Sequence, residues 1–245
     1  MQKRNPRSVA PEFIAGLCLI LLAPVALAAP AGSVTHLSGT ISAKRSDGAT
    51  RLLAIGSEIQ EGDELTTQRD TYARIKFVDS GEVVMRPETA LKVSSYAYHA
   101  EKPESDNIAL SLLRGGLRAI TGLIGKRNRD AYKLHTNTAT IGIRGTHFGA
   151  LLCADNCTGV PTVSGQAPDN GLHVDVSSGA IVVTTNAGQQ IVNTGQFGFV
   201  KDSFTLPVIR PPQDGVRVTM PQAISQNNAG GSGIGPGNQT QCAVQ

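Results

Sequence analysis

The chain has 245 residues, with 22 Lys and Arg against 19 Asp and Glu, and only 4% of its residues are aromatic, with no Trp. This near-neutral, aromatic-poor composition lacks the basic and aromatic surface with which proteins hold nucleic acids, so no nucleic-acid partner is expected. The length allows one large β domain or two small ones.

Residues 1–29 have the pattern of a secretory signal peptide. A basic start containing Lys3 and Arg4 precedes an apolar stretch from Phe13 to Leu22, and small residues up to Ala29 form a cleavage site. The apolar stretch is too short for a comfortable membrane span, and no later stretch is longer. We therefore predict a mature chain that is periplasmic or secreted and has no membrane span.

Residues 32–201 read as short strands separated by Gly, Asp and Ser turns about every 8–12 residues, a spacing typical of all-β domains. The stretch from Thr71 to Val78 shows the alternation best, because Ala73, Ile75 and Phe77 point to one side of the predicted strand. We predict an all-β domain over this range.

A weak internal repeat joins residues 34–67 and residues 174–200. In both copies, glycines recur at similar spacings between short apolar segments, as expected for hairpins with glycine corners. Two related hairpins at opposite ends of one domain indicate strands wound into a helical β-roll, or two packed sheets.

Residues 202–245 are predicted to be an extension of the domain. Prolines favour an extended connection at its start, and residues 225–245 are rich in Gly, Asn and Gln and nearly uncharged. A segment of this composition cannot bury enough apolar surface to fold, so we predict that the tail is disordered.

The stretch from Thr136 to Phe148 is the most distinctive in the chain. Ile141 and Ile143 alternate with small residues, and glycines stand on both sides of Arg144. The alternation predicts a half-buried strand, and the glycines indicate a bulge or a close backbone approach. Arg144 is interpreted either as an internal clamp on backbone carbonyls or as a contact to an anionic partner, and the clamp is favoured. The residues predicted to form this structural motif are Gly142, Arg144, Gly145 and Thr146.

Five basic residues form the densest basic stretch and a possible binding patch: Arg114, Arg118, Lys126, Arg127 and Arg129. One interpretation is a solvated face around a loop. The other is a patch that binds an anionic cell-surface polymer, with a salt-sensitive affinity.

Cys153 and Cys157 enclose a short turn-forming segment and are predicted to form a disulfide, which suits an exported protein. Cys242 has no assigned role. The histidines are scattered singly, so no metal site, cofactor or catalytic group is predicted, and the chain is not expected to be an enzyme.

Three ordered motifs resemble the FecR family. They are residues 62–67 followed by the strand and turn at 73–81, the stretch from Thr136 to Phe148, and the closing segment from Val174 to Val200. The resemblance implies a periplasmic or extracytoplasmic β module, helically wound from short strands. In the namesake proteins, the module relays a signal from an outer-membrane receptor to a cytoplasmic sigma factor. This chain shows neither the transmembrane helix nor the anti-sigma segment of that relay.

The leading functional interpretation is a non-enzymatic binding or scaffold module of the cell envelope. It would act through sheet edges and loops, because an exposed edge strand readily accepts another strand. Its partner would be an envelope protein or an anionic cell-surface polymer. The alternative is a periplasmic sensor that relays a signal through a separate membrane component.

Overall fold

The computed structural model describes residues 29–160, 162–163, 165–221 and 224. The predicted signal peptide, apart from its last residue, and the predicted disordered tail at 225–245 lie outside the described residues.

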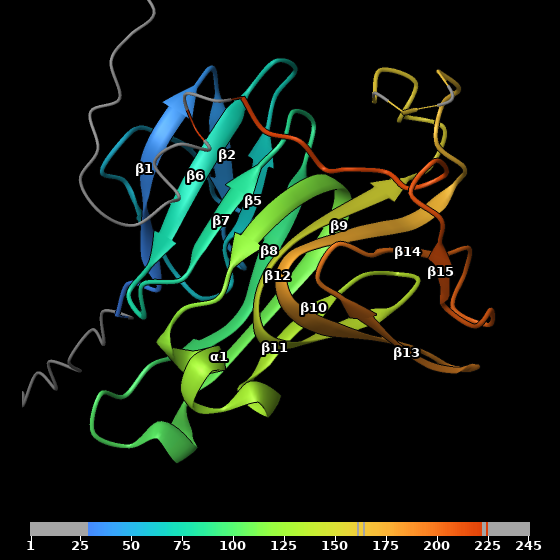
Figure 1. Ribbon diagram of the computed structural model, residues 1–245. Coiled ribbons are helices and arrows are strands. Elements are labelled where there is room, and N and C mark those ends of the chain that lie inside the picture. The colour runs from blue at the N-terminus through green and yellow to red at the C-terminus, as the bar shows by residue number, and fades with distance from the viewer. Residues whose placement is uncertain (1–28, 161, 164, 222–223, 225–245) are drawn as a thin grey trace, which may run out of the picture.

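Strands make up most of the described chain (Figure 1). Between residues 29 and 221, the described helical elements are one five-residue helix, α1 (Leu123–Arg127), and two 3-10 turns, η1 (Pro103–Ser105) and η2 (Arg129–Ala131). The strands are β1 (Gly32–Ser38), β2 (Ile41–Lys44), β3 (Thr50–Leu53), β4 (Glu58–Ile59), β5 (Glu64–Thr67), β6 (Tyr72–Phe77), β7 (Glu82–Met85), β8 (Ala90–Ala97), β9 (Asn107–Ile120), β10 (Tyr132–His135), β11 (Thr140–Cys153), β12 (Gly171–Thr185), β13 (Gly188–Asn193), β14 (Phe197–Val200) and β15 (Val208–Arg210). The predicted all-β fold is confirmed.

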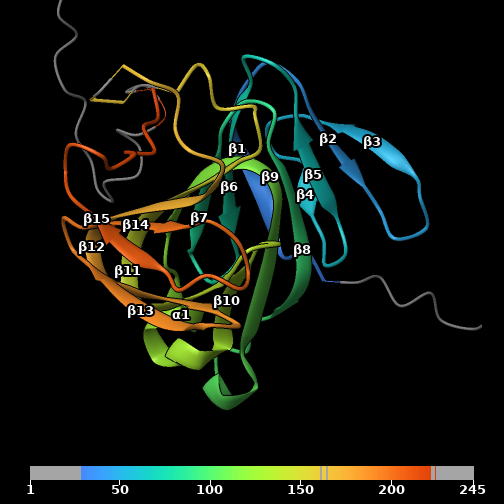
Figure 2. The same ribbon diagram turned by 90° about the vertical axis from the view of Figure 1, so that its right-hand side faces the viewer.

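The described strands form one continuous 15-stranded sheet that folds back on itself into two layers (Figures 1 and 2). The first layer has the order β4-β1-β6-β7-β9-β11-β12-β14-β15. The second layer has the order β3-β2-β5-β8-β9-β10-β11-β12-β13. The long strands β9, β11 and β12 belong to both layers because each crosses from one to the other partway along its length.

Glycines with positive φ stand at these three crossings: Gly115 (77°), Gly145 (65°) and Gly179 (77°). Left-handed backbone of this kind is easy for glycine and strained for other residues. At Gly179 there is a second reason, because a Cβ atom there would lie 2.3 Å from the carbonyl oxygen of Gly145. Gly145, part of the predicted structural motif, and Gly179 beside it therefore form one sharp bend shared by two paired strands.

The crossings lie in two rows at opposite edges of the layers. The first corner row contains Gly39, Asp70, Glu88 and Gly115, and the second contains Gly145, Gly179 and Gly195, all with positive φ. Residues 115–120 of β9 run antiparallel to residues 147–152 of β11, with Gly115 opposite Leu152 and Ile120 opposite His147. The bends of these two strands therefore lie at opposite ends of the pair.

The predicted internal repeat corresponds to a repeated structural unit. In the first copy β1, β2, β3 and β4 form a first-layer strand, a corner, a second-layer hairpin and a return strand, and in the second copy β12, β13 and β14 do the same. The return corners are bonded alike: Gly56 N donates to Val34 O (2.8 Å), and Gly195 N donates to Val176 O (2.8 Å). The similar spacing of glycines in the two copies therefore reflects the similar positions of the corners at which the chain passes between the layers.

The main hydrophobic core fills the space between the two layers. Ala73, Ile75 and Phe77 of β6 are buried in it, as the alternation predicts, together with Ile141 and Ile143 of β11. Aliphatic residues dominate this core, which is why a chain so poor in aromatic residues can still form it.

The chain beyond residue 201, predicted to be an extension, contributes to the folded body. β15 pairs with β14, and residues 214–220, here called the strap, cross the outer face of the first layer. Val216 and Val218 of the strap are buried against Leu151 and the two cysteines of the 153–157 loop in a second, smaller core. A turn closed by the Asp214 N–H, which donates to Pro211 O (3.0 Å), leads into the strap, and the alternating valines anchor it.

Candidate functional site

Most of the distinctive stretch from Thr136 to Phe148 lies in β11, which begins at Thr140 and bends from one layer to the other within this stretch. Gly145 makes the bend, and Thr146 is buried beside it. The Thr146 N–H donates to Thr121 Oγ1 (3.1 Å), and that hydroxyl donates to Thr146 O (2.9 Å). Gly142 lies opposite Lys133 and Val182, where a Cβ atom would meet nothing closer than 4.0 Å. The bend therefore depends on Gly145 and Thr146, whereas Gly142 has room for a side chain.

The interpretation of Arg144 as an internal clamp is wrong. The side chain is exposed, and no hydrogen bond or ion pair joins it to another described residue. It lies opposite Ala180, just before the bend, on the outer face of the second layer.

The clamp is Arg118, which the sequence places in the basic patch. Arg118 is only 8% exposed and forms an ion pair with the buried Asp175 (3.0 Å). It also donates to Val218 O of the strap (2.8 Å), to His147 Nε2 (3.1 Å) and to Ser177 Oγ. Burial, and secondarily the Arg118 charge, lower the pKa of His147, which keeps its imidazole neutral and able to accept this bond. Arg118 thus joins β9, β11, β12 and the strap.

The remaining basic residues do not form one patch. Arg114 lies near the first corner row, where its Nε donates to Glu88 O (3.0 Å). Lys126 and Arg129 are exposed on α1 and η2, which follow the far end of β9. Arg127 next to them is engaged with Asp106 (2.7 Å). The patch is therefore divided between the two edges of the fold, so the prediction of a single polymer-binding patch is wrong.

A disulfide joins Cys153 and Cys157, as the spacing predicts, and closes a small loop at the end of β11. Both cysteines are buried in the smaller core with the strap, whereas Asn156 and Thr158 are exposed. The loop is thereby held against the first layer while its polar residues face outward.

The most exposed apolar side chains near β15 belong to one short stretch, here called the apolar segment (residues 204–209). Phe204 is 79% exposed and Leu206 is 54% exposed, and Val208 and Ile209 of β15 are also exposed. This surface was not predicted from the sequence, although residues 204, 206 and 208 alternate with Thr205 and Pro207 in the manner of a half-buried strand.

Hydrogen bonds fix the conformation of the apolar segment. Asp202 Oδ1 accepts from the Thr205 hydroxyl (2.8 Å) and from Phe204 N (2.9 Å), which lowers the pKa of the Asp202 carboxyl. Thr205 O in turn accepts from the Thr185 hydroxyl (3.0 Å) at the β12–β13 turn. Phe204 is therefore displayed on a turn that is tied to the sheet.

Two properties of the described residues bear on the kind of site. No three or more His, Cys, Asp or Glu side chains there are grouped so that they could hold a metal ion. Likewise, the described part of the chain contains no helix long and apolar enough to cross a membrane.

The fold and its surfaces define the class as a two-layer, helically wound β module with a strapped outer face. The sequence profile of the family described as FecR protein matches residues 63–182, which run from just before β5 into β12. The chain therefore contains a FecR domain over these residues.

Among solved structures, the chain is similar to two crystal structures of a proposed anti-sigma factor from Parabacteroides distasonis, at 11% and 10% identity and TM-scores of 0.45 and 0.44. Each alignment covers 66% of this chain and 62% of the other. A structure described as a cell surface anchoring domain is 27% identical over 25% of this chain and 82% of its own, with a TM-score of 0.25. No curated protein matches this chain.

Proposed function

We propose that the chain is a non-enzymatic, extracytoplasmic binding module of the cell envelope that contacts a partner protein through its apolar segment. The signal-peptide pattern of residues 1–29 supports an exported protein. The Cys153–Cys157 disulfide supports an oxidising compartment. The FecR domain supports a place in envelope signalling.

The observation that carries the proposal is the exposure of Phe204 and Leu206 on a hydrogen-bonded turn. Aromatic and aliphatic side chains held in one conformation lose little entropy on binding, so their burial contributes efficiently to affinity. β15 beside them is an edge strand, yet Pro207 and Pro211 bracket its three residues and limit strand addition. Side-chain contact is therefore the favoured mode of binding here.

Site-specific photo-crosslinking in intact cells tests this proposal. A photoreactive residue replaces Phe204, and a matched control replaces Leu52 of β3, which is 76% exposed at the opposite end of the sheet. We expect adducts with an envelope protein from position 204 only, identified by mass spectrometry. The same adducts from both positions, or none from position 204, would contradict the proposal.

The signalling-related family favours a second candidate, in which the module is a periplasmic sensor that relays a signal to a separate membrane component. In that case, the partner crosslinked at position 204 would be an integral membrane protein. The yield of the crosslinked adduct would also change between growth conditions, because a sensor changes its contacts with the signal that it detects. A constant yield under all conditions would support the scaffold role.

A further inference from the structure

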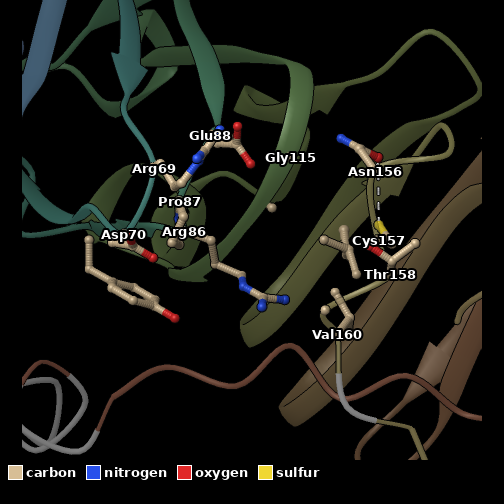
Figure 3. A pocket seen from close by; sticks show the side chains of 14 residues that line it. Arg69, Asp70, Arg86, Pro87, Glu88, Gly115, Asn156, Cys157, Thr158 and Val160 are labelled. Atoms are coloured by element: carbon tan, nitrogen blue, oxygen red, sulfur yellow. Dashed lines mark hydrogen bonds between the residues drawn. The ribbon is translucent and has the colours of Figure 1, made fainter. Parts of the chain in front are cut away.

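A cavity of about 350 Å³ lies against the first corner row, away from the apolar segment. Residues 86–88 and Gly115–Gly116 form one wall, and residues 156–160, around the disulfide loop, form the other. Figure 3 shows the Arg86 side chain extending from the first wall toward Thr158 and Val160 on the second. The volume lies within the roughly 300–1,000 Å³ typical of small-molecule sites.

The fold holds Arg86 in this position. Its N–H donates to Gly116 O (2.9 Å), and its carbonyl accepts from the Thr67 hydroxyl (2.6 Å). Its side chain passes over Gly116, where a Cβ atom would lie 3.4 Å from Arg86 Cδ and 2.8 Å from Leu151 Cδ1. The absence of a side chain at Gly116 therefore leaves room for the arginine to reach the cavity.

The guanidinium of Arg86 lacks a partner among the described residues. Its Nη1 atom is buried without a hydrogen bond, and no described carboxylate forms an ion pair with it. By contrast, Arg51, Arg118, Arg127 and Arg210 each form an ion pair with an aspartate. A guanidinium that lines a cavity and has no carboxylate partner among the described residues can take its acceptor from a ligand, since buried donors are normally satisfied.

We propose that this cavity binds an acidic sugar, with the ligand carboxylate on Arg86. The planar guanidinium fork matches a carboxylate in two parallel hydrogen bonds. Tyr72 and Pro87 also line the cavity and offer flat apolar surface for the face of a sugar ring. Asn156 and Thr158 on the opposite wall supply polar groups for ring hydroxyls.

The charge of the cavity favours a singly charged, hydroxyl-bearing ligand over phosphate. Asp70 and Glu88 line it together with Arg69 and Arg86, so the two cations are offset by two carboxylates. These carboxylates accept hydrogen bonds from sugar hydroxyls but repel a doubly charged oxyanion. Both residues have positive φ (59° and 53°), a rare conformation for a residue other than glycine that is often found at functional sites.

Isothermal titration calorimetry on the folded chain, with D-glucuronate as the probe, tests the proposal. Glucose serves as the neutral analogue, and acetate and phosphate test for simple anion binding. We expect glucuronate to bind and the other three to bind at least about tenfold more weakly. No glucuronate binding, or equal binding of acetate or phosphate, would overturn the assignment to an acidic sugar.

Variants then locate the site. Arg86→Gln is expected to weaken glucuronate binding by about tenfold or more, the loss that corresponds to one charge-assisted hydrogen bond. The matched control Arg144→Gln, exposed at the opposite edge, leaves the affinity unchanged. Thr158→Glu alters only an exposed residue and places a carboxylate opposite Arg86, so it should abolish binding even where Arg86→Gln perturbs folding. Unchanged affinity in Thr158→Glu would overturn the proposed site, without bearing on the contact at Phe204.

Discussion

Removing the Arg118 side chain is the sharpest test of the structure, because the same strand supplies its control. Arg118→Ala leaves Asp175 buried without its ion-pair partner and Val218 O without its donor. Breaking a buried, hydrogen-bonded ion pair from one side costs about 3–5 kcal/mol of stability. Arg114→Ala, four residues earlier in β9, removes an exposed side chain and is expected to change stability by less than about 0.5 kcal/mol.

Urea unfolding of the two variants and the parent chain measures this difference. At the usual dependence of about 1–3 kcal/mol per molar urea, Arg118→Ala should lower the unfolding midpoint by about 1 M or more, and Arg114→Ala should leave it nearly unchanged. Arg118→Met combined with Asp175→Leu removes both charges and should recover part of the loss. If Arg118→Ala cost less than about 1 kcal/mol, Arg118 would not be the clamp.

Four further predictions follow from the same structure. Arg144→Lys should change the free energy of unfolding by less than about 0.5 kcal/mol, because the side chain is exposed; a larger loss in urea unfolding would restore the clamp interpretation. Gly48→Ala should cost about 1–2 kcal/mol through its positive φ alone, and Gly179→Ala should cost more because its Cβ also meets Gly145 O; equal losses would contradict the shared bend. Replacing Cys153 and Cys157 with Ser should cost about 2 kcal/mol, the loop entropy of so short a ring, and should make the melting temperature insensitive to reductant. Burial lowers the pKa of His147 and His173, so the unfolded chain binds more protons and stability should fall as pH drops below about 6.5; His147→Gln should flatten that slope in urea unfolding measured across pH.

The sequence predicts the winding of the chain well because the winding is encoded locally. Alternation at Ala73, Ile75 and Phe77 identifies a strand with one buried face. Recurrent glycines mark the corners, since a sharp bend needs positive φ and close backbone approach. The corners formed by Asp70 and Glu88 could not be located in this way, because the prediction followed glycines alone.

The roles of the two arginines are not encoded locally. Arg118 and Arg144 both stand in alternating strands next to glycine bends, and only what covers each layer distinguishes them. The strap that buries Arg118 contributes Val218, 100 residues further along the chain. Arg86 is hidden from the sequence for the same reason, since the opposite wall of its cavity comes from the disulfide loop. Whether an arginine of these strands is buried in a structural ion pair therefore depends on packing between distant segments and not on the local sequence pattern.

The two proposed binding surfaces differ in their relation to the FecR domain. Both walls of the Arg86 cavity fall within residues 63–182, the part that the family profile matches, whereas the apolar segment at 204–209 lies beyond it. The cavity is formed where the disulfide loop folds back on the corner row, so it depends on the winding that defines the domain. The apolar segment is carried on a turn after β14 and can change without disturbing a layer crossing. The Arg86 cavity would therefore be retained wherever the domain keeps its winding, whereas the apolar segment could differ from one such protein to another. One module could in this way keep the same class of ligand and bind different partner proteins.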